Sequence, residues 1–351
     1  MNRRIKLCLE NIEKNGYDGL LVSNPINVSY LSGFRSADGF LLLNNKEKPI
    51  YFTNFLYNFE AKHINIWKTN LCPKDIFNCI VEEIFRLKLK NVAFESKHLT
   101  YLEYKKLKEV LIKKHINFSP LSDVIENIRA IKEEEEIILI NKAIKTSLEG
   151  FKFIEEIIEE KMTEKDLLVE LERFLKIKGD YELAFSPIIA FGKNTSLPHH
   201  IPEETKLKNN KLFLVDLGAK YQRYCADLTR VFFWGKMPNY LRKIYDIVRK
   251  SKDLAIRKIK EGIQAKEIDK TGREFIENKG FGKYFGHGLG HGVGIAVHEE
   301  PYINPHSKTI LKEGMVITIE PAIYIPGKFG IRLEDIVLVK SSKGEILSSE
   351  Y

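Results

Sequence analysis

Apolar residues recur at helical and strand spacings in alternation along roughly the first 120 residues of the chain. In residues 3–15, Ile5, Leu9 and Ile12 lie on one face of the helix that this spacing predicts. The apolar runs that follow predict strands at 18–23 and 91–96, a hairpin of 39–45 and 49–55, and helices at 76–89 and 101–115. Helices alternating with strands in this way favour a small α/β domain.

The pattern changes near residue 127, where we place a boundary between a domain of residues 1–127 and a domain of residues 128–351. In the second domain, helices are segregated from long apolar strands, which predicts an α+β fold. The helices are expected at 132–160, 163–178, 240–260 and 265–278, and the strands at 186–192, 211–218, 223–235, 313–325 and 330–339. The acidic run Glu133–Glu136 is typical of a solvated first helical turn, which we favour over an acidic binding site.

A glycine-rich block, residues 286–298 (GHGLGHGVGIAVH), lies between these helices and the last strands. A helix would not tolerate so many glycines, so His287 and His291 do not form a helical i, i+4 pair. Glycine lets the backbone approach a ligand or another strand closely, and this support carries the imidazoles of His287, His291 and His298. Because imidazole binds metals and transfers protons, the block indicates a metal or catalytic site; a glycine-rich turn with incidental histidines is the alternative.

Two aspartates on neighbouring predicted strands form a first carboxylate pair. Asp216 ends one apolar strand, and Asp227 lies on the next, equally far from a turn centred between Tyr221 and Gln222. Residues placed in this way face each other in antiparallel strands, so the two aspartates are expected to be direct cross-strand partners. Opposed like charges on buried strands are destabilising unless a cation lies between them. Turn-flanking aspartates at a sheet edge are the alternative.

Two glutamates repeat this arrangement in a second predicted hairpin. Glu320 and Glu334 are equidistant from Gly327, so these carboxylates are also expected to meet. Arg332 shares a strand face with Glu334, and Thr229 shares one with the second aspartate. Both side chains are therefore candidates for orienting the carboxylates.

Four carboxylates and one imidazole form a hard, oxygen-rich set of ligands that suits Mn²⁺, Co²⁺, Fe²⁺ or Zn²⁺ and lacks the thiolates of a structural zinc site. This number of ligands predicts a site for two divalent ions, and Mn²⁺ or Co²⁺ are favoured. The HExxH, P-loop and Gly-x-Ser-x-Gly motifs do not occur in the sequence, which excludes the enzyme classes that they mark.

Composition narrows the remaining function classes. The 351 residues are 44% apolar and 30% charged, which is typical of globular domains with real cores. Lysines and arginines give a net charge of +8 but are spread along the chain, so a solvated surface is a better interpretation than a nucleic-acid interface.

The expected location is the cytoplasm. The four cysteines include no CxxC pair, which favours reduced thiols. The N-terminal residues predict an amphipathic helix rather than a signal peptide, and no apolar run is long enough to span a membrane.

Five motifs together resemble those of the pita-bread metallopeptidases and, within them, the branch of Xaa-Pro dipeptidase (prolidase) and aminopeptidase P. They are VDLG with Asp216, YCADLTR with Asp227, GHGLGHGVG with His291, TIEP with Glu320 and IRLED with Glu334. The likeness covers essentially the whole chain, and NPINVSYLSGF (24–34) resembles the additional N-terminal domain of this branch. The resemblance implies a pita-bread catalytic domain preceded by a smaller creatinase-type α/β domain that serves substrate access and dimerisation.

The resemblance also implies metal ligands. Asp216 and Asp227 would hold one ion. Asp227 would also bridge to the second ion, together with His291, Glu320 and the bridging Glu334. The implied reaction is hydrolysis of the bond between an N-terminal residue and a proline in second position, in a dipeptide or a longer peptide.

Further catalytic residues are implied by the same match. His199 in SLPHH corresponds to a substrate-side histidine, and His287 and His298 to histidines that bind substrate and stabilise the tetrahedral intermediate. Glu320 corresponds to the proton shuttle, and Arg332 lies in the last motif. A binding module of the same fold without catalytic activity is the alternative, as is a metal-free creatine-hydrolysing relative; five intact ligand positions disfavour both.

Two positions depart from the branch. Ser186-Pro187 stand where relatives usually carry an acidic or polar residue followed by Thr. Tyr302 stands where some dipeptidases carry an Arg that binds the free carboxylate of the substrate, so we expect longer peptides to be accepted. His199 or Arg35 in the loop 32–39 are candidate replacements for that cation, and the resemblance implies a homodimer in which this loop's domain closes the partner's site.

Overall fold

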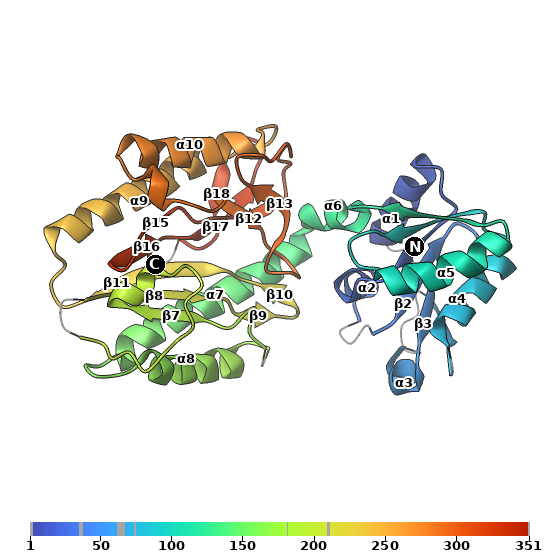
Figure 1. Ribbon diagram of the computed structural model, residues 1–351, viewed down its shortest axis with the longest axis horizontal. Helices are drawn as coiled ribbons and strands as arrows, with labels where there is room; N and C mark the ends of the chain where they lie inside the picture. The colour runs from blue at the N-terminus through green and yellow to red at the C-terminus, as the bar shows by residue number, and fades with distance from the viewer. Residues whose placement is uncertain are drawn as a thin grey trace. The chain divides into compact units, whose positions relative to one another are not determined.

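The computed structural model describes residues 3–34, 38–61, 67–73, 75–180, 182–208 and 211–349. The chain forms two compact units, Met1–Arg129 and Ala130–Tyr351 (Figure 1). Among the helices described, none combines the length and apolar character needed to cross a membrane. Arg35 lies outside the described residues.

The N-terminal unit is built on one mixed sheet of six strands in the order β4-β3-β2-β1-β5-β6. Its strands are β1 (Gly19–Val22), β2 (Phe40–Asn44), β3 (Ile50–Thr53), β4 (Lys68–Leu71), β5 (Asn91–Glu95) and β6 (Asn117–Leu121). Its helices are α1 (Arg3–Lys14), α2 (Pro25–Ser32), η1 (Phe55–Tyr57), α3 (Asn58–Ala61), α4 (Ile76–Arg86), α5 (Tyr101–Lys113) and α6 (Val124–Ala130). The predicted hairpin is present as antiparallel β2 and β3, and β1 pairs in parallel with β5, which confirms the α/β prediction.

Amphipathic helices cover this sheet. Ile80 and Ile84 of α4 and Leu107 and Leu111 of α5 are buried in one cluster with strand residues such as Phe52. The helical spacing of these residues is thus explained by one buried face.

The C-terminal unit contains a three-stranded sheet, β11-β8-β7, a five-stranded sheet, β13-β12-β14-β17-β18, and the two-stranded ladders β15-β16 and β10-β9. The strands are β7 (Ile188–Phe191), β8 (Lys211–Leu217), β9 (Lys220–Tyr221), β10 (Tyr224–Cys225), β11 (Leu228–Trp234), β12 (Gly290–Gly292), β13 (Glu299–Ile303), β14 (Val316–Ile319), β15 (Ala322–Ile325), β16 (Phe329–Arg332), β17 (Asp335–Val339) and β18 (Gly344–Ile346). The helices are α7 (Glu134–Ile157), α8 (Glu164–Lys178), η2 (Gly192–Ser196), α9 (Asn239–Lys258), α10 (Ala265–Asn278) and η3 (Gly282–Tyr284).

Two helix pairs enclose these strands (Figure 1). One core cluster joins α7 and α8 to strand residues such as Val215 and Ile336, and the other joins α9 and α10 to residues such as Ile317 and Ile331. Helices on either side of segregated strands confirm the α+β prediction for this unit.

The first hairpin differs from its prediction. In the ladder of β8 and β11, Asp216 pairs with Thr229, so the prediction that Asp216 faces Asp227 directly is wrong. Gln222 and Arg223 both have positive φ, 44° and 76°, and form the two central residues of a tight turn of type I′. Because this turn is centred one residue later than predicted, each cross-strand partner moves by two residues. Asp227 lies directly before β11.

The second hairpin follows its prediction. Ala322 pairs with Arg332 in β15 and β16, around the turn at Gly327, and Ile319 pairs with Asp335 in β14 and β17. Both pairs have the same centre, so the register predicted from Gly327 is confirmed. Glu320 and Glu334 are therefore opposite each other where the chain passes from one ladder to the other.

Candidate active site

A cavity of about 600 Å³ in the C-terminal unit brings the predicted site residues together. The predicted metal ligands lie in or directly beside five strands: Asp216 near the end of β8, Asp227 directly before β11, His291 within β12, Glu320 directly after β14 and Glu334 directly before β17. The other predicted residues also line this cavity: His199, His287, His298 and Arg332. Side chains far apart in the sequence thus meet at one place.

The ligand atoms of these side chains are close enough to share metal ions. His291 Nε2 lies 3.5 Å from Asp227 Oδ2 and 3.5 Å from Glu320 Oε1. Three sets of side chains each have ligand atoms within 4.8 Å of one another: Asp216, Asp227 and Glu334; His291, Glu320 and Glu334; and Asp227, His291 and His298. The overlap of these sets makes one continuous group of oxygen and nitrogen atoms.

Backbone carbonyls fix the tautomers of two histidines. The Nδ1 atom of His291 lies 3.1 Å from the carbonyl oxygen of Gly292, and that of His287 lies 2.7 Å from the carbonyl oxygen of Gly288. A carbonyl only accepts, so each Nδ1 carries the proton and each Nε2 of a neutral ring presents a lone pair. Burial lowers the pKa of both rings to about 4, so both are neutral at pH 7.

Arg332, which the sequence predicted to orient the carboxylates, contacts Asp216 directly and Glu334 through Thr229. Its guanidinium donates to Thr229 Oγ1 at 2.9 Å, to Tyr324 Oη at 2.6 Å and to Asp216 Oδ2, and the Thr229 hydroxyl donates to Glu334 Oε2 at 2.9 Å. A further donor of Arg332 is bonded to the carbonyl of Pro198 at 3.2 Å. Four of its five N–H groups are thus already bonded within the protein.

The donor chemistry fits divalent cations. Asp216 Oδ1 and Glu334 Oε1 are buried and have no hydrogen-bond partner among the described residues. Burial and then the charge of Glu334 raise the pKa values of Asp227 and Glu320 well above their usual range. Burial and then the charge of Asp216 raise the pKa of Glu334 to about 8. Among the described residues that line the cavity, these four carboxylates share the single guanidinium of Arg332, and a cation would stabilise the buried oxygen atoms that have no partner.

We expect the metal-free protein to lose stability as the pH rises from about 6.5 to about 8.5. With the pKa of Glu334 raised to about 8, the folded state holds a proton that the unfolded state releases, so stability falls through this window. The pKa values of His287 and His291 are lowered, so their contribution to stability increases as the pH rises. That increase is complete at about pH 6.5, the ordinary pKa of histidine, and does not affect the window above it.

The measurement is the unfolding midpoint of EDTA-treated protein, which should fall by about 5 °C or more across the window. Glu334→Gln, which cannot ionise, is the control and should reduce this fall, as should added Mn²⁺. A midpoint independent of pH in the metal-free wild type would contradict the expectation.

The glycines of β12 explain how His291 is held. A Cβ at Gly290 would lie 2.0 Å from the carbonyl oxygen of Thr318, and one at Gly292 would lie 2.2 Å from the carbonyl oxygen of Glu300. Neighbouring backbone therefore occupies the space of a side chain on both sides of the histidine, and only glycine fits there.

Two buried side-chain contacts that the sequence analysis did not predict support the histidine loops. Lys132 Nζ lies 2.8 Å from Glu299 Oε1, next to His298, and both side chains are buried. Glu164 at the start of α8 accepts hydrogen bonds from the Phe191 amide at 2.6 Å and from His200 Nε2 at 2.7 Å, in the segment that carries His199. No local motif marks such partners, because they are distant in sequence.

Tyr324 is a further residue that the sequence reading missed. It lines the cavity, bonds Arg332, and has its pKa raised to about 12 by burial. The signal was available, since Tyr324 lies four residues after Glu320 and the side chains of a strand alternate with period two.

A second cavity of about 340 Å³ reaches the same metal-ligand candidates. Asp216, Asp227, His199 and His298 line both cavities. The second one is otherwise mainly apolar and includes the departing positions Ser186-Pro187 with Phe185, Ile188, Ile201, Pro202 and Val297. The carboxylates thus have space on two sides.

Comparisons with known proteins agree with this arrangement. The model of metallopeptidase family M24 matches residues 139–341, and the model of the creatinase/prolidase N-terminal domain matches residues 4–131. The chain is 35% identical over 350 residues to the Xaa-Pro dipeptidase of Pyrococcus horikoshii, covering 99% of this chain and 97% of the relative.

Solved structures of a dipeptidase and of an aminopeptidase are both similar to this chain. The Xaa-Pro dipeptidase from Bacillus anthracis has a TM-score of 0.94 at 31% identity, over 99% of this chain and 97% of that one. The X-Pro aminopeptidase from Thermotoga maritima has a TM-score of 0.88 at 31% identity, over 97% of this chain and 98% of that one.

Proposed function

Because the chain belongs to metallopeptidase family M24, with a creatinase/prolidase N-terminal domain before its catalytic unit, we propose that it hydrolyses the bond between an N-terminal residue and a proline in second position. It is a metallo-exopeptidase that uses divalent metal ions. The observation that carries the proposal is the convergence of Asp216, Asp227, His291, Glu320 and Glu334 in one cavity. We also propose a cytoplasmic location, supported by the free cysteines Cys8, Cys72, Cys79 and Cys225.

We propose that these five side chains hold two divalent ions, Mn²⁺ or Co²⁺ in preference to Zn²⁺ or Fe²⁺. Asp216 and Asp227 would hold one ion, and His291, Glu320 and Glu334 would hold the other, with Asp227 and Glu334 contributing to both. When bound, such ions lower the pKa of water and polarise the scissile carbonyl.

The proton transfers and substrate contacts are assigned to Glu320, to two histidines and to Arg332. Glu320 accepts the proton of the attacking water and returns it to the proline nitrogen. His298 donates to the oxygen on which negative charge develops. His287, expected from the sequence to share that role, presents an acceptor at Nε2 in its neutral form, so we propose that it accepts a hydrogen bond from a substrate N–H instead. Arg332 holds Asp216 and Tyr324 in position.

The test measures metal content by mass spectrometry beside hydrolysis of Ala-Pro, with Ala-Ala as the control substrate. We expect bound divalent metal and cleavage of Ala-Pro well ahead of Ala-Ala. A protein that binds Ala-Pro without cleaving it would be the alternative, a binding module of the same fold.

Both dipeptides and longer peptides with proline second are expected to be cleaved. Arg332 is the only arginine or lysine among the described residues that line the main cavity, and its donors are largely occupied. A fixed cation that needs a free carboxylate penalises longer substrates, because it is left desolvated and unpaired. Tyr302 offers a neutral hydroxyl instead, so Ala-Pro and Ala-Pro-Ala should have kcat/KM values within about tenfold of each other.

Two variants sharpen this comparison. Tyr302→Arg should shift the preference towards Ala-Pro, whereas Tyr302→Phe, the matched control, should leave it unchanged. If the wild type cleaves the tripeptide more slowly by about 10³, equivalent to about 4 kcal/mol, another group supplies the cation and the argument from Tyr302 is wrong.

We also propose a homodimer in which the N-terminal unit contributes to the interface and to substrate access. Phe55 and Leu56 of this unit are 80% and 78% exposed, which is unusual for large apolar side chains and typical of an interface. Sedimentation should give twice the chain mass of 40.7 kDa. Phe55→Glu with Leu56→Glu should produce monomers, whereas Tyr101→Glu, an exposed aromatic of the same unit, should not. A fully active wild-type monomer would count against the proposal.

A further inference from the structure

The C-terminal unit has a cleft of about 410 Å³ that shares no lining residue with the main cavity. Its floor is apolar and includes the buried side chains of Phe191, Leu212, Leu241 and Phe329. Five exposed lysines line it: Lys193, Lys206, Lys208, Lys211 and Lys328. No aspartate or glutamate is among the described residues that line the cleft. The cleft therefore combines a packed apolar base with a cationic rim.

These lysines differ from others in the same unit. None of the five forms an ion pair with a carboxylate of the described chain, whereas Lys176, Lys220 and Lys270 each do. Of the nearby acids, Glu204 pairs with Lys165. Asp166 is bonded to Thr163, and its pKa is lowered by these hydrogen bonds and also by the charge of Lys206. Lys206 thus has a carboxylate nearby, but none of the five lysines is in an ion pair with a carboxylate of the described chain, and five ammonium groups gathered in this way repel one another. A bound anion would relieve that repulsion.

The start of α9 adds a second cationic element. Tyr240 and Leu241, in the first turn of this 20-residue helix, line the cleft. The preceding Pro238 provides no side-chain cap, and the first turn contains no acidic residue. Free N–H groups and the helix dipole at such an end favour anions, phosphate in particular.

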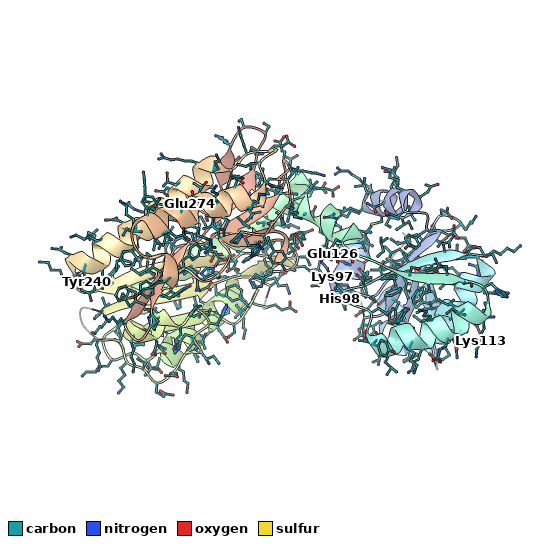
Figure 2. The ribbon with its side chains drawn as sticks, turned by 45° about the horizontal axis from the view of Figure 1, so that its top comes forward. Lys97, His98, Lys113, Glu126, Tyr240 and Glu274 are labelled. Atoms are coloured by element: carbon teal, nitrogen blue, oxygen red, sulfur yellow. The ribbon has the colours of Figure 1, made fainter. Side chains whose placement is uncertain are left out.

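An exposed aromatic ring lies beside these charges. Tyr240 is 58% exposed, and Figure 2 shows it at the outer edge of the unit. Its ring centroid lies 6.1 Å from that of Phe329, at an interplanar angle of 57°. The ring offers a face on which a flat heterocycle could stack.

The walls of the cleft are held in place by buried hydrogen bonds. Glu164 accepts from the Phe191 amide and from Asn194 Nδ2 at 3.0 Å, and Thr195 Oγ1 accepts from the Gly330 amide at 2.8 Å. Lys193 and Lys328 are next to these anchored segments. A preformed site reduces the cost of ordering that binding would otherwise incur.

We propose that this cleft binds a small ligand with two or three linked phosphate groups, either a nucleoside di- or triphosphate or inorganic tripolyphosphate. The phosphates would contact the lysine ammonium groups and the N–H groups at the start of α9. Tyr240 would contact the base if the ligand is a nucleotide.

The test is calorimetric titration of the metal-loaded enzyme with ADP, AMP and tripolyphosphate at low ionic strength. Lys206→Glu with Lys328→Glu should weaken tripolyphosphate and ADP binding by about tenfold or more. Lys152→Glu with Lys258→Glu changes the net charge equally, on exposed parts of α7 and α9 outside the cleft, and should have an effect of about twofold or less. AMP, with one phosphate, should bind more weakly than ADP.

Tyr240→Ala distinguishes a nucleotide from inorganic tripolyphosphate as the ligand. A loss of affinity for ADP alone indicates a nucleotide site, and an unchanged affinity for both indicates a site for the phosphate chain. Absence of binding to the wild type would overturn the proposal. Equal effects of the two charge-reversal pairs would also overturn it. Binding that neither pair affects would overturn it too, because the phosphates would then bind at the catalytic metals. The fold of the Lys206→Glu, Lys328→Glu variant is verified by retained Ala-Pro hydrolysis and an unchanged unfolding midpoint. If the hydrolysis or the midpoint changes, Lys206→Ala with Lys328→Ala is used in place of that variant.

Discussion

Alanine in place of His291 or Glu334 is expected to reduce kcat by about a thousandfold or more and to lower the number of metal ions bound per chain. Each substitution removes a ligand atom, which should cost more than the ten- to hundredfold typical of losing a residue that only supports a ligand. Glu334 Oε1 has no other described partner, and His291 Nε2 presents its lone pair to Asp227 and Glu320. Metal content and Ala-Pro hydrolysis are measured on the same preparations.

His298→Ala is the matched histidine control. His298 lies near Asp227 and His291, but in the proposed assignment it contacts substrate rather than metal. Its variant should keep the wild-type metal content while turning over more slowly. If His298→Ala loses metal and His291→Ala does not, the two histidines have exchanged roles and the ligand assignment is wrong.

Removal of metal by EDTA is expected to abolish hydrolysis, and Mn²⁺ or Co²⁺ is expected to restore it. All five proposed ligands serve the ions, and metal binding to such a site is coupled to the ionisation of its carboxylates. The raised pKa values of Asp227, Glu320 and Glu334 mean that these groups are protonated more readily when no cation is present. Reloading should therefore release protons, which calorimetry in buffers of different ionisation enthalpy can count.

The calcium complex of EDTA is the control for effects of the chelator itself and should leave activity intact. Comparison of Mn²⁺, Co²⁺, Zn²⁺ and Fe²⁺ at equal occupancy tests the expected order of metals. Full activity in protein stripped of metal would contradict a metal-dependent reaction for this chain.

Most of the fold could be predicted because its elements have one buried face. The helical spacing of Ile80 and Ile84 predicts both a helix and the face of α4 that packs. In the same way, the two neighbouring apolar runs predict the paired strands β2 and β3. The change of pattern near residue 127 marked a boundary, and the structure divides the chain after Arg129.

Three predicted strands are in fact broken, each at a proposed metal ligand. The run 223–235 is interrupted at Asp227, the run 313–325 at Glu320 and the run 330–339 at Glu334. Apolar alternation continues on both sides of each break, so the sequence pattern alone could not reveal it. A carboxylate that turns towards the cavity leaves the regular ladder, and this choice depends on its neighbours across the sheet.

The register of the first hairpin was missed for a local reason. A turn with two positive φ values is usually marked by Asn or Gly, whereas this turn uses Gln222 and Arg223. The second hairpin has Gly327 at φ 69° and was placed correctly. Turn chemistry thus decided which carboxylate pairing could be predicted.

The glycines on either side of His291 also bear on attempts to alter the enzyme's specificity. Random libraries that include positions 290 and 292 would consist mainly of inactive members, because any side chain there meets the backbone of Thr318 or Glu300. Tyr302 and Asn304 line the same cavity from outside the proposed metal-ligand set. Diversity is better directed to these two positions, where a new side chain can meet the substrate without moving the support of the histidine.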